Sequence, residues 1–238
     1  MTSSNDSGIR VAVVPARGGS KRIPRKNIVD FHGKPIIHWP LEMLVDSGLF
    51  EVIVVSTDDE EVAAVATEID GVTIHERPRE LAGDEVPTAP VIIDALAGCE
   101  LSTDSPITEV TVMYPTSVFC RAIDLAAARK RLANASVDLV MSVGRFRSPI
   151  QRAWRTSEND LIERVDPTAA LLRTQDLEVC FFDAAQFYVS APDAWIKMAA
   201  GAQVATAAHV LEDWQTMDID TPDDLDTARV MFGARSVL

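Results

Sequence analysis

Short apolar runs alternate with helical patterns over residues 10–143. EVIVVS at residues 51–56 is a β-branched run, which is typical of a strand buried on both faces. Similar runs predict strands at 10–15, 72–75, 110–114 and 139–143. Between them, helices are predicted at 36–47, 58–67, 87–96 and 122–135. This alternation predicts βαβ units on a mostly parallel sheet, in which ligands bind beyond the carboxyl ends of the strands.

The pattern weakens after residue 143. Residues 144–182 are rich in Arg and interrupted by prolines, so we expect an insertion that leaves the core. Regular structure is expected again at 185–189, 209–211 and 214–219. The last helix should begin near Pro222, which suits the first helical position. The expected organisation is a polar, disordered tail at residues 1–8 and a single domain at 9–238 that carries the insertion.

The overall charge argues against a nucleic-acid partner. The chain has 22 basic and 36 acidic side chains, a formal charge of −14, whereas phosphate-backbone binding needs clustered cations.

No stretch approaches the roughly 18 apolar residues of a membrane span, and no apolar leader is present, so no membrane partner is expected. The three cysteines lack metal-ligand spacing, and a cytoplasmic location is expected. Five basic residues nevertheless gather at 17–26 without an acid between them, which indicates a site for a small anion.

The string VVPARGGSKRIPRKN at residues 13–27 directly follows the first predicted strand. The Gly18–Gly19 pair allows the backbone to approach a ligand closely and to turn its N–H groups toward it. Arg17, Lys21 and Arg25 can supply the opposing charge for a triphosphate. The P-loop pattern G-x-x-x-x-G-K-[ST] is absent. The pattern G-x-G-x-x-G is absent as well, which disfavours a dehydrogenase.

The part ARGGSKRIPRKN of this string resembles the signature of the acylneuraminate cytidylyltransferases, which activate nonulosonic acids as CMP conjugates. The resemblance continues in order with STDDEE, RPRELAGD, YPTS and IDTPDD at 56–61, 77–84, 114–117 and 219–224. RTQDLE and DAAQFY are most similar to the pseudaminic acid branch, at 173–178 and 183–188. The resemblance implies a three-layer, mostly parallel Rossmann-like nucleotidyltransferase sheet with a small inserted dimerisation arm at 144–182. It also implies a homodimer in which the arm reaches the partner's site.

Asp218 and Asp220 are the expected ligands of Mg²⁺, the one cofactor that we expect. They stand two residues apart at the end of a predicted strand, so their carboxylates should project to the same side. Mg²⁺ takes one or two carboxylates and completes its shell with substrate phosphates and water. Asp220 has an alternative role as the cap of the next helix, whereas Asp218 has none. The resemblance also assigns this pair to the metal.

The resemblance implies roles for further residues. The nucleotide-binding set is Ala16, Arg17, Gly18, Gly19, Lys21, Asn27, Arg77 and Thr88. The sugar-binding set is Tyr114, Thr116, Arg173, Gln175, Asp183 and Gln186. From spacing alone, a polar and solvated strand face is as good an explanation as a sugar site for Arg173, Gln175, Asp183 and Gln186. Arg77 and Asn27 carry donors suited to the O2 carbonyl and N3 of cytosine. Tyr114 departs from the family pattern, since the neuraminate-using enzymes commonly have Gln at this place.

The expected reaction is in-line attack by the anomeric hydroxyl of an acidic nine-carbon sugar on the α-phosphorus of CTP. The expected catalytic residues are Arg17 and Lys21, which would stabilise the leaving pyrophosphate, and Asp218. Pseudaminic acid is the favoured acceptor, with neuraminate, legionaminate and 3-deoxy-octulosonate as alternatives. A non-catalytic sensor of nucleotide sugars is the alternative from a different class. The intact Arg17, Lys21 and Asp218 argue against a sensor, and a dehydrogenase is the weakest alternative.

Overall fold

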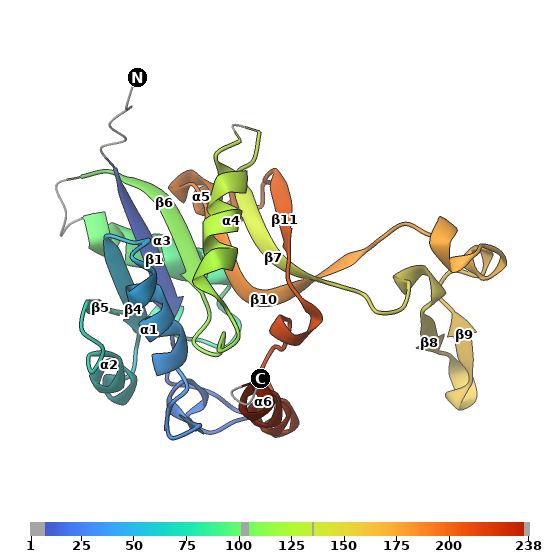
Figure 1. Ribbon diagram of the computed structural model, residues 1–238, viewed down its shortest axis with the longest axis horizontal. Helices are drawn as coiled ribbons and strands as arrows, with labels where there is room; N and C mark the ends of the chain where they lie inside the picture. Colours follow the sequence, from blue (N-terminus) through green and yellow to red (C-terminus); the bar gives the residue numbers. More distant parts are fainter. Residues whose placement is uncertain (1–7, 101–104, 135, 236–238) are drawn as a thin grey trace.

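The computed structural model describes residues 8–100, 105–134 and 136–235 (Figure 1). Residues 1–7 of the predicted tail lie outside that part. A seven-stranded sheet has the order β11-β7-β10-β6-β1-β4-β5. Its strands are β1 Ile9–Pro15, β4 Val52–Thr57, β5 Val72–Glu76, β6 Ile107–Met113, β7 Leu139–Arg145, β10 Phe181–Ser190 and β11 Thr206–Val210. Only β10 runs antiparallel to its neighbours in this sheet, so the predicted mostly parallel sheet is confirmed.

Helices cover both faces of the sheet and make three layers. They are α1 His38–Ser47, α2 Glu60–Ala66, α3 Thr88–Glu100, α4 Ala122–Leu132 and α5 Pro192–Ala199. Successive residues of β1 enter different cores, because side chains alternate across a strand. Val14 belongs to the core that contains Leu41 of α1, whereas Val13 belongs to the core that contains Ile92 of α3. Burial on both faces explains the continuous apolar runs, and the predicted three-layer α/β architecture is confirmed.

A third core fixes the end of the chain beside the loop that follows β1. The last helix, α6 (Pro222–Arg235), begins at the predicted proline. Phe232 of α6 packs against Phe31 with ring centroids 5.2 Å apart. Phe31 belongs to a short hairpin of β2 (Asp30–Phe31) and β3 (Lys34–Pro35), which sequence patterns did not reveal. Ile219 is fully buried in the same core, so the segment before α6 is held against the body.

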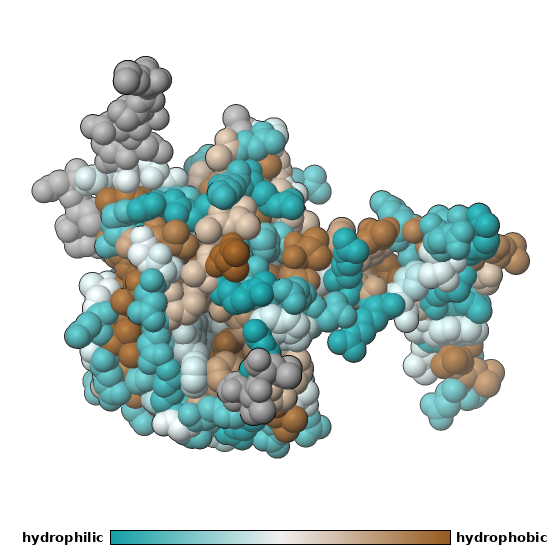
Figure 2. All heavy atoms as spheres, in the orientation of Figure 1, coloured by the Kyte–Doolittle hydropathy of each residue, from teal (hydrophilic) through white to brown (hydrophobic). Residues whose placement is uncertain are grey.

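Residues 146–180, here called the arm, project from the body between β7 and β10 (Figure 1). The arm contains a small antiparallel pair, β8 (Trp154–Thr156) and β9 (Ile162–Arg164). Short 3₁₀ turns surround this pair at Ile150–Arg152, Glu158–Asp160, Thr168–Leu171 and Thr174–Asp176. The arm exposes large apolar side chains, and Figure 2 shows brown patches on it. The exposed apolar side chains of the arm include Ile150, Trp154, Leu161, Ile162, Val165, Leu171, Leu172 and Val179.

The prediction of regular structure at 214–219 is wrong. A 3₁₀ turn at Asp213–Gln215 is followed by irregular backbone up to α6. Side chains bond this backbone in place of a neighbouring strand, because the carbonyls of Met217 and Ile219 accept from Gln186 Nε2 and Lys26 Nζ, each at 3.1 Å. The start of the segment is anchored by the buried Gln215. Its Nε2 donates to the Asp124 carboxylate at 2.8 Å and to the Phe119 carbonyl at 3.2 Å. In the part of the chain that the structure describes, no helix is long and apolar enough to cross a membrane.

Candidate active site

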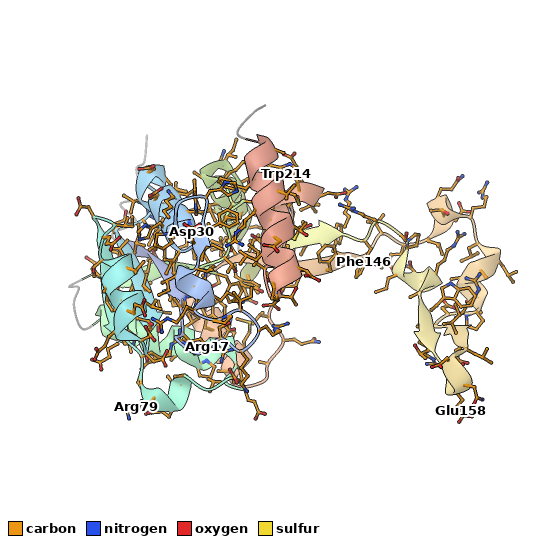
Figure 3. All side chains as sticks on the ribbon, turned by 90° about the horizontal axis from the view of Figure 1, so that it is seen from below. Arg17, Asp30, Arg79, Phe146, Glu158 and Trp214 are labelled. Carbon is orange, nitrogen blue, oxygen red and sulfur yellow. The ribbon has the colours of Figure 1, made fainter. Side chains whose placement is uncertain are left out.

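A cleft of about 600 Å³ lies beyond the carboxyl ends of β1 and β6. This is where parallel α/β sheets bind ligands. Its walls come from the phosphate loop (residues 16–27), the loop before α3, the turn after β6, the middle of β10 and the segment before α6. The lining residues are Arg17, Gly19, Ser20, Lys21, Arg22, Lys26, Asn27, Asp84, Tyr114, Pro115, Thr116, Ala185, Asp218 and Asp220. In Figure 3, Arg17 lies on the body, well apart from Glu158 at the far end of the arm.

The phosphate loop is fixed by contacts of its own backbone. The buried Asn27 donates from Nδ2 to the carbonyl of Arg17 at 2.8 Å, which ties the two ends of the loop together. The Gly18 N–H donates to Asp58 at 3.0 Å. A Cβ on Gly18 would lie 2.4 Å from the Asp59 carboxylate, so only glycine fits there. A Cβ on Gly19 would meet nothing within 4 Å, since Gly19 faces the open cleft.

The cations of the phosphate loop are all paired with carboxylates. Arg17 and Lys21 both bind Asp84. Asp220 binds Arg22 at 2.9 Å and Lys26 at 3.0 Å. Arg25, expected to face a triphosphate, instead binds Asp59 at 2.7 Å and does not line the cleft. The cleft therefore presents four cations and three carboxylates around one open space.

Asp218 lies beside Asp220 at the edge of this cleft, on irregular backbone and not at the end of a strand as predicted. Surrounding protein and then the nearby charge of Asp220 raise the pKa of Asp218. Among the described residues, no hydrogen bond or ion pair reaches the Asp218 carboxylate. Two adjacent carboxylates that repel one another, one of them unpaired, are suitable ligands for a hard divalent cation such as Mg²⁺. The described residues hold no group of three or more His, Cys, Asp or Glu placed to hold a metal ion, so a cation here would complete its shell with water and substrate phosphates.

A smaller pocket of about 230 Å³ adjoins the cleft and shares Arg17, Asp84 and Tyr114 with it. Arg77 and Thr88 line this pocket. Arg77 is buried and donates from Nη2 to the carbonyl of Ser56 at 2.7 Å. Burial lowers the pKa of Arg77. Ala16 is fully buried behind the pocket and also bonds Ser56, from its N–H at 2.9 Å.

The predicted sugar-binding residues fall into three places, which are the cleft, the arm and β10. Tyr114 and Thr116 line the cleft. Thr88 lies 3.3 Å from the Tyr114 hydroxyl, which connects the cleft to the smaller pocket. Arg173 and Gln175 lie on the arm, where Arg173 binds Asp176 at 2.7 Å, and neither lines the cleft of its own chain.

Asp183 and Gln186 lie on β10 on either side of Ala184 and Ala185, and of these only Ala185 lines the cleft. Asp183 accepts from the Tyr188 hydroxyl at 2.6 Å and from the Ala185 N–H at 2.9 Å. Ala185 lines the cleft with φ of 50°, an uncommon conformation for a residue with a Cβ. Gln186 is 1% exposed and donates from Nε2 to the carbonyls of Ala184 at 2.9 Å and Met217 at 3.1 Å. Gln186 therefore joins β10 to the residue before Asp218.

The predicted sets left out Arg22, Lys26 and Asp84, although all three line the cleft. The signal for the two cations was present, because both belong to the basic run at 17–26. The signal for Asp84 was weaker. It belongs to the segment RPRELAGD, but its contact with Arg17 joins residues 67 positions apart, which no local pattern reveals.

Comparisons with known proteins show the family and the fold. A family model described as cytidylyltransferase matches residues 11–114. The pseudaminic acid cytidylyltransferase of Campylobacter jejuni subsp. jejuni serotype O:2 is 32% identical over 222 residues, which are 93% of this chain and 95% of that protein. This chain belongs to the cytidylyltransferase family. The expected family is thereby confirmed. The N-acylneuraminate cytidylyltransferase of Streptococcus agalactiae serotype V is 25% identical to this cytidylyltransferase over 90% of the chain and 51% of that relative.

Solved structures share the fold of this cytidylyltransferase. A CMP:2-keto-3-deoxy-manno-octonic acid synthetase complexed with CTP superposes with a TM-score of 0.69 at 15% identity, over 96% of this chain and all of that one. A 4-diphosphocytidyl-2C-methyl-D-erythritol synthase from Anaerococcus prevotii superposes with a TM-score of 0.65 at 11% identity, over 96% of this chain and 97% of that one. At these identities the likeness concerns the fold, and it agrees with the predicted Rossmann-like nucleotidyltransferase sheet.

Proposed function

We propose that this cytidylyltransferase transfers CMP from CTP to the anomeric hydroxyl of a nonulosonic acid, most directly pseudaminic acid, and releases pyrophosphate. The observation that carries the proposal is a cleft that joins the phosphate loop to Asp218 and Tyr114, in a chain 32% identical to a pseudaminic acid cytidylyltransferase over nearly its whole length. CTP and the acidic sugar are the proposed small-molecule partners. A chain that uses CTP is expected to act in the cytoplasm.

The phosphate loop is proposed to hold the triphosphate. Arg17 and Lys21 supply charge to the β- and γ-phosphates and stabilise the pyrophosphate as it leaves. The open backbone at Gly19 lets a phosphate oxygen approach closely. Arg77 and Thr88 then lie in the adjoining pocket, where the cytosine and ribose fit with Asn27 nearby. Catalysis of this kind rests on positioning and charge neutralisation more than on covalent chemistry.

Asp218 and Asp220 are the residues that would hold Mg²⁺. When bound, Mg²⁺ supplies Lewis acidity and charge neutralisation for phosphoryl transfer. The contribution of the chain is to keep Asp218 unpaired and Asp220 close to it. Although surrounding protein acts in the opposite direction, Lys26 and Arg22 lower the pKa of Asp220, so this carboxylate is ionised at neutral pH.

The acceptor sugar is proposed to lie against Tyr114, Thr116 and the floor formed by β10. Arg173 and Gln175 belong to the arm and do not line the cleft of their own chain. A second copy of the chain would bring them there and would cover the exposed apolar side chains of the arm. We therefore include a homodimer in the proposal, with the insertion predicted at 144–182, which contains the arm, as its dimerisation element and Arg173 addressing the sugar carboxylate of the partner's site.

Phosphorus NMR tests the reaction directly. Incubation with CTP, Mg²⁺ and pseudaminic acid should convert the triphosphate signals into pyrophosphate and a phosphodiester. An unchanged spectrum, together with calorimetric binding of CTP, would contradict the transferase and favour the nucleotide-sugar sensor. Conversion with neuraminate, legionaminate or 3-deoxy-octulosonate in place of pseudaminic acid would keep the reaction and change the substrate.

A further inference from the structure

Asp84 occupies a position that the proposed function leaves unexplained. Its carboxylate binds Arg17 and Lys21 together, and these are the two cations proposed to hold the departing pyrophosphate. Among the described residues, no other carboxylate pairs with either cation. The Lys21 and Arg17 hydrogen bonds lower the pKa of Asp84, so the group is an anion at neutral pH. An oxyanion of the chain itself thus sits where a phosphate oxyanion would bind.

The location of Asp84 suits an exchange with the ligand. Asp84 lines both the cleft and the smaller pocket that contains Arg77 and Thr88. It belongs to a turn between a 3₁₀ segment (Arg79–Leu81) and α3, and it is exposed. Lys21 is 83% exposed, so neither partner of this ion pair is locked by packing. Exposed ion pairs of this kind are weak and exchange readily.

The chemistry decides the direction of the exchange. A polyphosphate carries more charge than one carboxylate and offers several acceptor oxygens to Arg17 and Lys21. CTP can therefore displace Asp84 from both cations. Pyrophosphate that has lost its covalent link to the nucleotide is held by fewer contacts, and Asp84 can then compete for the same two cations.

Building on the proposed function, we propose that Asp84 is the exchange anion of the phosphate loop. It pairs with Arg17 and Lys21 when no polyphosphate is bound, yields them to CTP, and takes them back as pyrophosphate leaves. Asp84 thereby weakens the binding of phosphate ligands and speeds the release of pyrophosphate. The opposite role, in which Asp84 only orients the two cations for the ligand, predicts the opposite change in affinity.

Asp84→Asn distinguishes these roles, with Glu85→Gln as the matched control. Glu85 is the next residue, is also exposed, and loses the same single charge without touching the two cations. Calorimetry with inorganic tripolyphosphate in metal-free buffer should show binding about three- to tenfold tighter for Asp84→Asn, the scale of two exposed ion pairs, and unchanged binding for Glu85→Gln. In turnover, Asp84→Asn should lower both the KM for CTP and kcat, and pyrophosphate should inhibit it at lower concentrations.

Asp84→Ser is a second neutral variant and should agree with Asp84→Asn. Weaker or unchanged binding of tripolyphosphate by both variants would overturn the proposal. An equal gain in Glu85→Gln would overturn it too, because the effect would then come from overall charge. The binding measurement needs no sugar and no turnover. If the wild-type chain binds tripolyphosphate but never consumes CTP, the proposed function is refuted. The role of Asp84 in phosphate binding is still tested in that case, because it depends only on the tripolyphosphate affinities of the variants.

Discussion

Replacing Asp218 with Asn should abolish turnover without harming the fold. The side chain is open to the cleft and makes no hydrogen bond or ion pair with any described residue, so its removal breaks no contact. Surrounding protein and Asp220 raise the pKa of Asp218, which means that its ionised form costs folding free energy at neutral pH. Asn has nearly the same shape and carries no charge.

The two expected effects have different sizes. The free energy of unfolding should change by no more than about 0.5 kcal/mol, in the direction of stabilisation, as for an exposed position without packing contacts. A change of this size shifts Tm by about 1–2 °C in a chain of this length. The rate should fall by about a hundred- to a thousandfold, because one of the two carboxylates that would hold Mg²⁺ is lost.

Thermal unfolding and pyrophosphate release should be measured on the same preparations. Asp223→Asn is the matched control, because Asp223 is exposed in the first turn of α6 and does not line the cleft. Its activity should stay near that of the wild-type chain. A calorimetric titration with Mn²⁺ adds a readout other than turnover and should show weaker binding to Asp218→Asn alone. Full activity of Asp218→Asn, or a large loss of stability, would refute the reasoning.

Three other predictions concern the pocket, the arm and the surface. Arg77→Lys removes the guanidinium fork that bonds Ser56 of β4, so urea unfolding should show a loss of about 1–3 kcal/mol and calorimetry should show weaker CTP binding. Leu171→Glu on the arm should convert a dimer into a monomer in light scattering, whereas Ile123→Glu, equally apolar and exposed on the body, should not. Arg10 lowers the pKa of Glu51 to about 2, so the pair stabilises the fold above the ordinary value near 4.5 and loses this effect as the pH falls toward 2. Glu51→Gln should therefore cost up to about 1 kcal/mol in urea unfolding at pH 7 and nothing near pH 2, and an equal cost at both pH values would contradict the assignment.

The central strands were predictable because burial on both faces leaves a continuous apolar signal, as in β4. The floor of the cleft was not. Asp183 bonds the Ala185 N–H, and the Ser142 hydroxyl accepts from the next N–H groups of β10, so side chains replace ladder bonds and shift the register. The irregular segment before α6 escaped prediction for the same reason, since the side chains of Gln186 and Lys26 bond its carbonyls in place of a neighbouring strand.

The candidate site was predictable where its residues are close in sequence. The Gly18–Gly19 pair and the cations around it form one string, and Asp218 stands two residues from Asp220. Contacts between distant segments, such as Arg17 with Asp84, depend on the tertiary fold and leave no local pattern. The role of Arg173 depends on a second chain, which neither the sequence nor a single copy of the fold contains.

The most direct test of the account is pyrophosphate release by the purified chain with CTP, Mg²⁺ and a panel of nonulosonic acids, with Asp218→Asn as the blank. The account predicts rapid release with pseudaminic acid, slower or no release with neuraminate, legionaminate and 3-deoxy-octulosonate, and almost none from the blank. No release with any of these sugars, from a chain that still binds CTP, would contradict it.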